Sequence, residues 1–262
     1  MEFHKYTALG NDYIVIDPNK ESIFLTEERI KRLCDRNFGI GADGILYGPI
    51  FEGNKVRLKI YNSDGTEAEM CGNGFRMFAR YLHDQNLTYD DSIELITKGG
   101  IIKIDRVSRD RYSVNLGKYK IIDEHKEFVI GNEKLVGVSI ELGNPHCVLV
   151  MDRISRDMAF KFGKYIENYP DFKHKTNVQF AQILDENNIA IEIWERGSGY
   201  TLASGTSSAA AAAVLYELKA TNKNVTVHMP GGNIVTEIKD GEIIIEGGVS
   251  FLFSGKFNKG EL

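Results

Sequence analysis

The stretch Asn62–Arg80 contains side chains that could take part in a reaction, with Cys71 at its turning point. A strand-like alternation over residues 55–61 leads into it, and a polar loop containing glycine follows. From Phe75 onward the apolar residues recur at helical spacing, so Cys71 should lie at or just before a helix N-terminus. The free N–H groups and the positive dipole end there bind a carboxylate and lower a thiol pKa. A cysteine at that position can act as a base or a nucleophile.

The second half of the chain repeats this arrangement. The Gly10-Asn11 turn matches Gly143-Asn144 at an offset of 133 residues (144 − 11), and the same offset places Ser204 at the position of Cys71. A helical pattern follows both residues. Two similar halves could therefore present two helix N-termini, each led by a small nucleophilic residue, to one ligand. The alternative is a duplicated fold whose turns match for structural reasons only.

Composition limits the class of protein. A length of 262 residues suits one large or two modest domains, and 42% hydrophobic residues supply real cores. A net charge of −5 disfavours a broad surface for nucleic acid or acidic membranes. The sequence contains neither an 18-residue apolar run nor the basic and apolar regions of a signal peptide. Three cysteines without CxxC spacing argue against a disulfide framework and a zinc site, and they fit a reducing cytoplasm.

Turn residues and periodicity predict many short strands and a few helices. Helices are expected near 27–36, after Cys71 to about 84, near 155–168, and from Ser207 to about Leu218. Strands are expected at 2–7, 13–17, 45–48, 55–61, 93–96, 101–106, 112–116, 127–130, 135–141, 146–150, 176–182, 189–194, 223–228, 233–238, 242–246 and 249–254.

The helix from Ser207 contains five consecutive alanines and is small on every side, which is typical of a buried helix. Many short strands around one apolar helix in each half predict an α+β fold of two pseudo-symmetric domains. Each domain would be a β-barrel-like curved sheet wrapped on its central helix. The expected boundaries are 1–117, with a C-terminal tail of about 252–262 returning to it, and 118–251.

Several other residues are better explained by packing than by chemistry. Cys34 falls on the apolar stripe of the first helix, where a free cysteine behaves as a small core residue. The glycine loop at 39–44 is no dinucleotide fingerprint, because no helix pattern follows it. His146 and Cys147 are expected to support the fold. The histidines show no spacing typical of a metal site.

The motifs together resemble the diaminopimelate epimerase family along the whole chain: GNDY, GIGADG, NSDGTEAEMCGNG, GNPHCV, TNVQF and WERGSGYTLASGT. The resemblance implies two pseudo-symmetric domains with the site in the cleft between them. It also implies inversion at an amino acid α-carbon without cofactor or metal. The family's acid/base pair is two cysteines, of which the first matches Cys71 and the second is replaced by Ser204. Tyr200 also departs from the family, which usually has glutamate there.

The resemblance also assigns substrate contacts. Those to the non-reacting amino acid end fall on Asn11, Asn62, Asn144, Asn177, Glu195 and Arg196. An arginine for a carboxylate, a glutamate for an ammonium and amides for orientation are what a zwitterion needs. The reacting carboxylate would rest on the backbone N–H groups of Gly72, Asn73, Gly205 and Thr206. The simpler alternatives are that the asparagines only make turns and that Glu195 and Arg196 form a solvated pair.

Ser204 is the difficulty for catalysis. A serine hydroxyl without an adjacent base is a poor proton acceptor, and nothing near it in sequence supplies one. It is an introduced substitution, a natural divergence with altered chemistry, or a sign of lost turnover. The first expectation is a cytoplasmic isomerase of lysine and cell-wall precursor metabolism that inverts LL- to meso-diaminopimelate. The alternatives are a racemase or dehydratase of another amino acid, or a catalytically weak amino acid binder. The expected partner is a small-molecule amino acid, with a homodimer left open.

Overall fold

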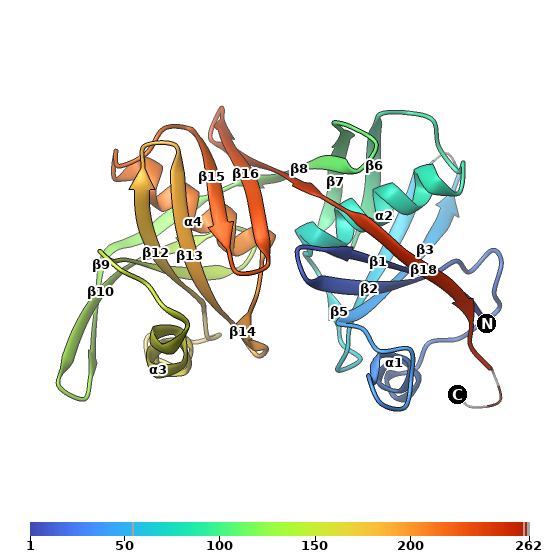
Figure 1. Cartoon of the computed structure of the whole chain (residues 1–262), viewed down its shortest axis with the longest axis horizontal. Helices are drawn as coiled ribbons and strands as arrows, with labels where there is room; N and C mark the ends of the chain where they lie inside the picture. The colour runs from blue at the N-terminus through green and yellow to red at the C-terminus, as the bar shows by residue number, and fades with distance from the viewer. Residues whose placement is uncertain (54, 259, 261–262) are drawn as a thin grey trace. The chain divides into compact units, whose positions relative to one another are not determined.

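The computed structural model describes residues 1–53, 55–258 and 260 of the chain (Figure 1). The chain divides into two compact units, Met1–Val114 with Gly247–Leu262, and Asn115–Glu246. It passes from the first unit to the second within strand β8 (Arg111–Lys118) and returns within β17 (Glu242–Gly248). Within the described residues, both units are built mainly of strands, and two helices belong to each.

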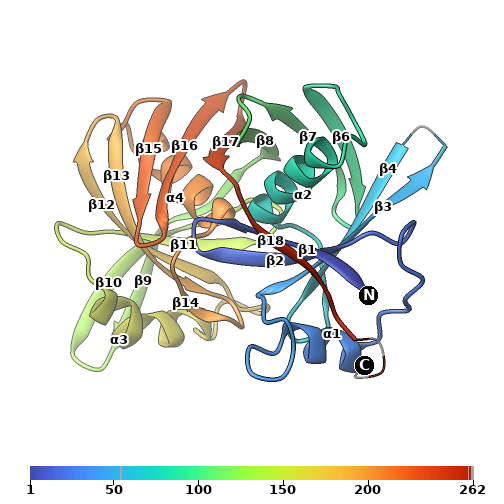
Figure 2. The same cartoon turned by 45° about the vertical axis from the view of Figure 1, so that its right-hand side comes forward.

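The first unit is a curved sheet around helix α2. Its strands are β1 (Glu2–Ala8), β2 (Asn11–Ile16), β3 (Gly44–Glu52), β4 (Lys55–Asn62), β5 (Glu67–Ala68), β6 (Ser92–Thr97), β7 (Gly100–Arg106) and β18 (Ser250–Lys256), and its helices are α1 (Glu27–Cys34) and α2 (Gly72–Asp84). Helix α2 contacts β1, β2, β3 and β7, and its residues are buried from its first turn almost to its end (Figure 2). The strands therefore surround this helix, as predicted.

The second unit repeats the plan around helix α4. Its strands are β9 (Lys120–Ile130), β10 (Glu133–Glu141), β11 (Pro145–Val150), β12 (Asn177–Asp185), β13 (Asn188–Glu195), β14 (Gly199–Thr201), β15 (Asn224–Met229) and β16 (Gly232–Lys239), and its helices are α3 (Arg156–Glu167) and α4 (Gly205–Glu217). Helix α4 contacts β10, β11, β12, β13, β15 and β16 and is buried along its alanine run. Small side chains on every face let strands approach it from several sides. The predicted α+β class, a curved sheet wrapped on a central helix, is confirmed in both units.

The internal repeat in the sequence is a repeat of strand register. In the parallel pair β2–β3, Tyr13 lies opposite Gly44. In the parallel pair β11–β12, His146 lies opposite Asn177. Tyr13 and His146, and likewise Gly44 and Asn177, are separated by the same offset as Asn11 and Asn144. The first and last residues of α2 and α4 are separated by this offset too. The two units can therefore be compared position by position.

Some predicted bounds were wrong. The strand expected at 45–48 runs to Glu52, because an irregularity between Tyr47 and Ile50 lets it continue past Gly48-Pro49. The strand expected at 127–130 is the end of β9, whose charged first half pairs with β10 despite low strand propensity. Strands β5 and β14 were not predicted, because two or three residues carry no readable period.

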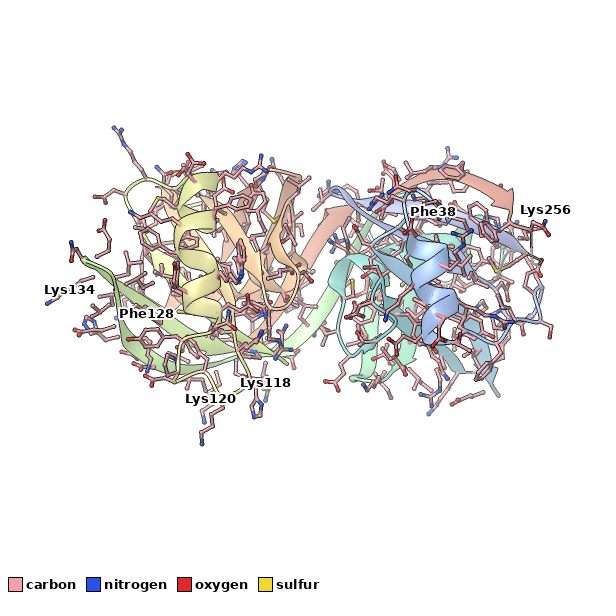
Figure 3. The ribbon with its side chains drawn as sticks, turned by 90° about the horizontal axis from the view of Figure 1, so that it is seen from below. Phe38, Lys118, Lys120, Phe128, Lys134 and Lys256 are labelled. Atoms are coloured by element: carbon pink, nitrogen blue, oxygen red, sulfur yellow. The ribbon has the colours of Figure 1, made fainter. Side chains whose placement is uncertain are left out.

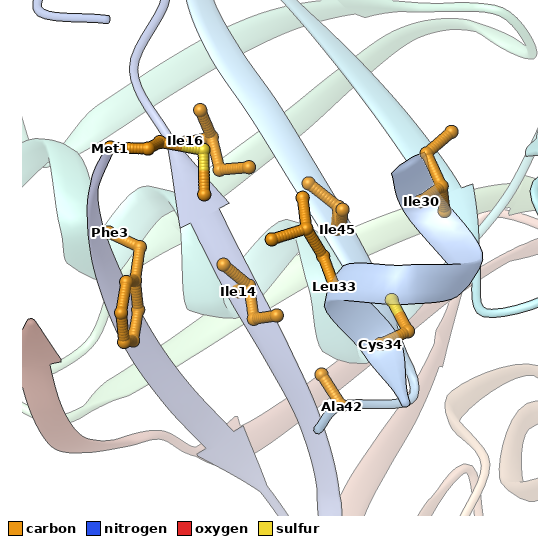
Figure 4. Close-up of a cluster of buried hydrophobic side chains, with 9 residues drawn as sticks. All are labelled: Met1, Phe3, Ile14, Ile16, Ile30, Leu33, Cys34, Ala42 and Ile45. Atoms are coloured by element: carbon orange, nitrogen blue, oxygen red, sulfur yellow. The ribbon is translucent and has the colours of Figure 1, made fainter. Parts of the chain in front are cut away.

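Each unit also has a smaller apolar cluster beneath its outer helix. Helix α1 begins after the cap Thr26 and buries Ile30, Leu33 and Cys34 against β2 and β3 (Figure 4). Burial raises the pKa of the Cys34 thiol to about 12, so Cys34 is a core residue, as expected. In the second unit Phe128, labelled in Figure 3, lies in the cluster that α3 covers.

Candidate functional site

Cys71 is the N-cap of α2. Its sulfur accepts a hydrogen bond from the backbone N–H of Gly74 at 3.3 Å, and its backbone is extended (φ −152°, ψ 93°). The side chain is half-buried, unlike the other two cysteines, which are buried. The N–H groups of Gly72 and Asn73 follow in the first turn, where a helix offers them no acceptor of its own. The predicted position of Cys71 directly before a helix N-terminus is confirmed.

Two further side chains act on this thiol, one by contact and one by its charge, and neither was predicted from the sequence. The sulfur is hydrogen-bonded to the Tyr13 hydroxyl of β2 at 3.6 Å. One turn into α2, Arg76 is completely buried and donates to the side-chain oxygen of Asn73 and to the carbonyl of Gly72. Burial lowers the pKa of Arg76 to about 10, while the nearby Cys71 opposes that shift. Arg76 is thus cationic at neutral pH and favours a thiolate at Cys71. An arginine between Phe75 and Met77, on a predicted buried helix, was the available signal.

Ser204 is the N-cap of α4, as predicted. Its hydroxyl accepts from the N–H of Ser207 at 3.3 Å and lies 3.4 Å from the hydroxyl of Thr206. Among the residues that the structure describes, these two groups are the hydrogen-bonding neighbours of the Ser204 hydroxyl, and neither is a base. The N–H groups of Gly205 and Thr206 occupy the first turn, as those of Gly72 and Asn73 do in α2.

Asn11 lies against the N-terminus of α2. The Asn73 amide donates to the Asn11 side-chain oxygen at 3.5 Å, and the Asn11 amide donates to Asp43 at 2.7 Å. Asp43 also accepts from the N–H of Asp12 at 3.0 Å and from Arg36 at 2.9 Å. The structure therefore brings Asn11 and Asn73 together and fixes the Asn11 amide by a carboxylate from the glycine loop. From the sequence, that stretch was identified as a glycine loop, but this role for Asp43 was not predicted.

A cluster of charged side chains lies next to the Asn11 turn. Arg36 makes two hydrogen bonds to the Asp12 carboxylate, and Lys5 approaches the same group at 2.8 Å. Burial pushes the pKa of Asp12 upward, but the hydrogen bonds from Arg36 and Lys5 outweigh it and hold that pKa below its usual value.

Asn62, another predicted substrate contact, has a different environment. Its amide donates to the Thr66 hydroxyl within its own loop at 3.0 Å.

Asn144 is oriented by a buried polar chain. The Gln179 amide donates to the Ser207 hydroxyl at 3.0 Å and reaches His146 Nδ1 at 3.1 Å. Burial lowers the pKa of His146 to about 3, so the ring is neutral and its remaining proton is assigned to Nε2. That N–H donates to the Asn144 side-chain oxygen at 2.8 Å. Asn144 is left with its amide N–H groups as donors, which suits a carboxylate ligand.

Asn177 connects two of the predicted contacts. Its side-chain oxygen accepts from the backbone N–H of Arg196 at 3.0 Å, and its amide donates to the carbonyl of Pro145 at 2.9 Å. It thereby joins the Asn144 turn to the turn that carries Glu195 and Arg196. The Arg196 side chain is exposed and donates to the carbonyl of His174 at 3.2 Å. Its guanidinium keeps further donors for a ligand.

Glu167, at the end of α3, holds the same turn and was not predicted. Its carboxylate accepts from the indole N–H of Trp194 at 2.8 Å and from the N–H of Gly197 at 3.0 Å. Burial raises the pKa of Glu167, but these hydrogen bonds and Lys175 outweigh it and lower the pKa overall. The buried anion therefore fixes the strand end and the turn on either side of Glu195 and Arg196. In the sequence it looked like an ordinary helix-end glutamate.

Tyr200 packs on the outer helix of its unit. Its hydroxyl donates to Glu192 at 2.8 Å, and its ring stacks on Phe160 with centroids 5.1 Å apart. The Arg156 guanidinium lies 5.2 Å from the Tyr200 ring centroid. Tyr200 is therefore held by α3 and β13 through its ring and its hydroxyl.

Within the described residues, no group of three or more His, Cys, Asp or Glu side chains could hold a metal ion. No helix in that part of the chain is long and apolar enough to cross a membrane.

Comparison with known proteins decides the family. The model for diaminopimelate epimerase matches residues 3–122 and 138–252. The chain belongs to the diaminopimelate epimerase family. "Diaminopimelate epimerase 2" of Nostoc sp. is 44% identical over 256 residues, which cover 92% of this chain and 89% of that protein. The diaminopimelate epimerase of Halothermothrix orenii is 35% identical over 276 residues, covering 98% and 97%.

Solved structures share the fold at lower identity. A probable proline racemase from Agrobacterium radiobacter has a TM-score of 0.76 at 11% identity, covering 98% of this chain and 93% of that one. A phenazine biosynthesis protein of the PhzF family from Bacillus anthracis has a TM-score of 0.75 at 15% identity, covering 97% and 98%. These likenesses show the fold alone. Family membership makes the chain an isomerase of the epimerase and racemase type, which confirms the expected class of enzyme.

Proposed function

We propose that the chain interconverts LL- and meso-diaminopimelate in lysine and cell-wall precursor metabolism, with Cys71 as the base and without a cofactor. The observation that carries the proposal is the N-terminus of α2. There a half-buried thiol caps the helix, two backbone N–H groups follow it, and the buried cation Arg76 lies one turn away. Such a site stabilises both a thiolate and the charge that develops on a substrate carboxylate.

The proposed reaction removes the α-proton on one face and returns a proton on the other. The Cys71 thiolate accepts the proton. The carboxylate of the reacting centre takes up the developing negative charge, held by N–H groups of Gly72, Asn73, Gly205 and Thr206. Ser204, or a water that it holds, delivers the proton on the opposite face. Solvent reprotonates the oxygen that gave up this proton and takes the proton from Cys71. In the reverse direction the Ser204 hydroxyl is the weaker base, because its neighbours, Thr206 and Ser207, supply no group to accept its proton.

The non-reacting end of the substrate is assigned to the amides of Asn11, Asn62, Asn144 and Asn177 and to the charged pair Glu195 and Arg196. The orientation of the Asn144 amide supports this assignment, because His146 occupies its oxygen and leaves its donors available. The anchoring of Arg196 by Asn177 supports it too, because the backbone of the turn is fixed while the guanidinium stays exposed.

Removing the Arg196 guanidinium should weaken substrate binding. Charge-assisted hydrogen bonds are worth about 1.5–3 kcal/mol, so Arg196→Ala is expected to raise the Kd for diaminopimelate by about 10- to 150-fold. Isothermal titration calorimetry measures this directly. The control is Arg153→Ala, which removes an exposed arginine of the same unit and should leave the Kd unchanged. Equal affinity for the Arg196 variant and the unaltered protein would remove Arg196 from the substrate site.

The proposed activity is tested by proton NMR in D₂O with LL- and meso-diaminopimelate supplied separately. Loss of the α-proton signal reports exchange, and appearance of the other isomer reports inversion. Because the N-cap is a thiol in α2 and a hydroxyl in α4, we expect exchange to outpace inversion, and to do so for one isomer more than for the other. Binding without any exchange would contradict the proposed reaction and favour an amino acid binding role.

We also propose that the protein works in the cytoplasm and assembles as a homodimer. The three free cysteines support a reducing compartment. The apolar side chains of Phe251, Leu252 and Phe253 on β18 are 44–46% exposed, and a second copy of the chain would cover them. Light scattering after size-exclusion chromatography tests the dimer, since a monomer mass at micromolar concentration would contradict it.

A further inference from the structure

We infer that Tyr13 is a positioning residue for the Cys71 thiol, holding the sulfur in place and favouring its ionised form. The inference rests on the proposed function in so far as Cys71 is the base. The Tyr13 hydroxyl lies 3.6 Å from the Cys71 sulfur, although the two residues are 58 positions apart in the chain. The tyrosine side chain belongs to a regular strand, so the contact is set by the sheet and the helix rather than by a loop.

The position of the Tyr13 ring is tightly determined. Tyr13 lies between Tyr6 of β1 and Gly44 of β3, and only 5% of its surface is exposed. A Cβ atom added at Gly44 would lie 2.5 Å from a carbon of the Tyr13 ring. The ring therefore passes directly over Gly44, in space that any larger residue there would occupy. Because the buried ring has so little freedom, the Tyr13 hydroxyl is held in one position, next to the Cys71 sulfur.

The second unit shows what the same position does beside a serine. His146 stands at the position of Tyr13, and Asn177 at the position of Gly44. The buried His146 ring is hydrogen-bonded to Asn144 and Gln179, whereas within the described residues the Ser204 hydroxyl is hydrogen-bonded to Thr206 and Ser207 of its own helix. The unit in which a strand side chain brings a hydroxyl to the helix N-cap is therefore the unit whose N-cap is a thiol. This difference links Tyr13 to the chemistry of Cys71 rather than to the shared fold.

The hydrogen bond should strengthen when the thiol ionises. In the neutral form the weak S–H donor faces the Tyr13 oxygen. In the ionised form the Tyr13 O–H donates to the thiolate, and a hydrogen bond to a charged acceptor is the stronger kind. The Gly74 N–H and the Arg76 cation, both from α2, act on the sulfur in the same direction. Loss of the Tyr13 hydroxyl should therefore raise the pKa of Cys71.

The test is the pH profile of Cys71 alkylation in Tyr13→Phe, a change that keeps the buried ring and removes only the hydroxyl. Iodoacetamide labelling is followed by mass spectrometry of the peptide that contains Cys71, between pH 5 and 10. We expect the alkylation midpoint to rise by about one pH unit, the size expected for loss of one hydrogen bond to a charged group. Cys34 and Cys147 are buried and serve as slowly reacting internal references.

The matched control is Tyr81→Phe. This buried tyrosine of α2 donates its hydroxyl to Asp17 at 3.1 Å, so its loss perturbs the same helix without touching the sulfur. Its alkylation midpoint should equal that of the unaltered protein. An unchanged midpoint in Tyr13→Phe, or an equal shift in both variants, would overturn the inference.

Labelling needs no substrate, so the inference and the proposed function can fail separately. A raised midpoint in a protein that never exchanges the α-proton of diaminopimelate would keep Tyr13 as a thiol-positioning residue and reject the proposed reaction. If the α-proton of diaminopimelate is exchanged but the alkylation midpoint of Tyr13→Phe does not shift, the proposed reaction stands and the inference about Tyr13 is rejected. If both hold, exchange by Tyr13→Phe at pH 7 should fall several-fold and recover as the pH is raised, which a purely structural defect would not do.

Discussion

Replacing Cys71 with serine is expected to lower α-proton exchange by about 10³-fold or more while leaving the Kd for diaminopimelate within a few-fold of its starting value. The reason is the acidity of the side chain, since a thiol ionises near pH 8.5 and a serine hydroxyl does not ionise at physiological pH. Serine suits the N-cap of α2, because Ser204 already fills the equivalent place in α4 with a similar extended backbone. Exchange is measured by NMR in D₂O and binding by calorimetry.

Two companion variants separate the base from the helix cap. Cys71→Ala removes both, and the lost cap costs about 1 kcal/mol of stability, which thermal unfolding detects. Cys34→Ala removes a buried thiol of the same unit that has no proposed part in the reaction, and it should exchange normally. Exchange that persists in Cys71→Ser at a rate near that of the unaltered protein would show that another group is the base.

Replacing Ser204 with cysteine is expected to increase inversion between LL- and meso-diaminopimelate by about 10²- to 10⁴-fold, the usual contribution of one general acid or base. The change places a thiol at the N-terminus of α4, where the N–H of Ser207 can donate to it as that of Gly74 does to Cys71. The rate of α-proton exchange for the isomer that Cys71 already deprotonates should change much less. The measurement is the ratio of inversion to exchange in D₂O, with reductant present throughout.

Ser204→Ala is the control for the increase in inversion expected of Ser204→Cys, because it removes the hydroxyl without adding a thiol. If the hydroxyl only holds a water or donates weakly, exchange by Cys71 survives its removal and inversion falls further. If exchange disappears in Ser204→Ala, the serine itself takes part in proton removal and is a stronger base than its neighbours Thr206 and Ser207 indicate. An unaltered inversion rate in Ser204→Cys would mean that the second face is not served from the α4 N-terminus.

Local patterns predicted much of this protein because the underlying interactions are local. The spacing of apolar residues after Cys71 and the small residues after Ser204 set the two buried helices, and the caps follow from the residues directly before them. The repeat could be recognised because the same turns and strand registers occur twice. The ends of β3 and β9 were misjudged because pairing with a neighbouring strand, which no short window contains, decided them.

The amino-acid sequence alone was enough to predict the family, the class of fold, and the residue types at the two helix N-termini. The distant side chains that hold the candidate site residues could be identified only in the folded chain: Tyr13 at the Cys71 sulfur, Asp43 on the Asn11 amide, Gln179 on His146, and Glu167 at the Arg196 turn. The physical reason is that a hydrogen bond depends on distance and direction in space. Residues far apart in the chain meet such limits only after the strands have paired and the helices have packed.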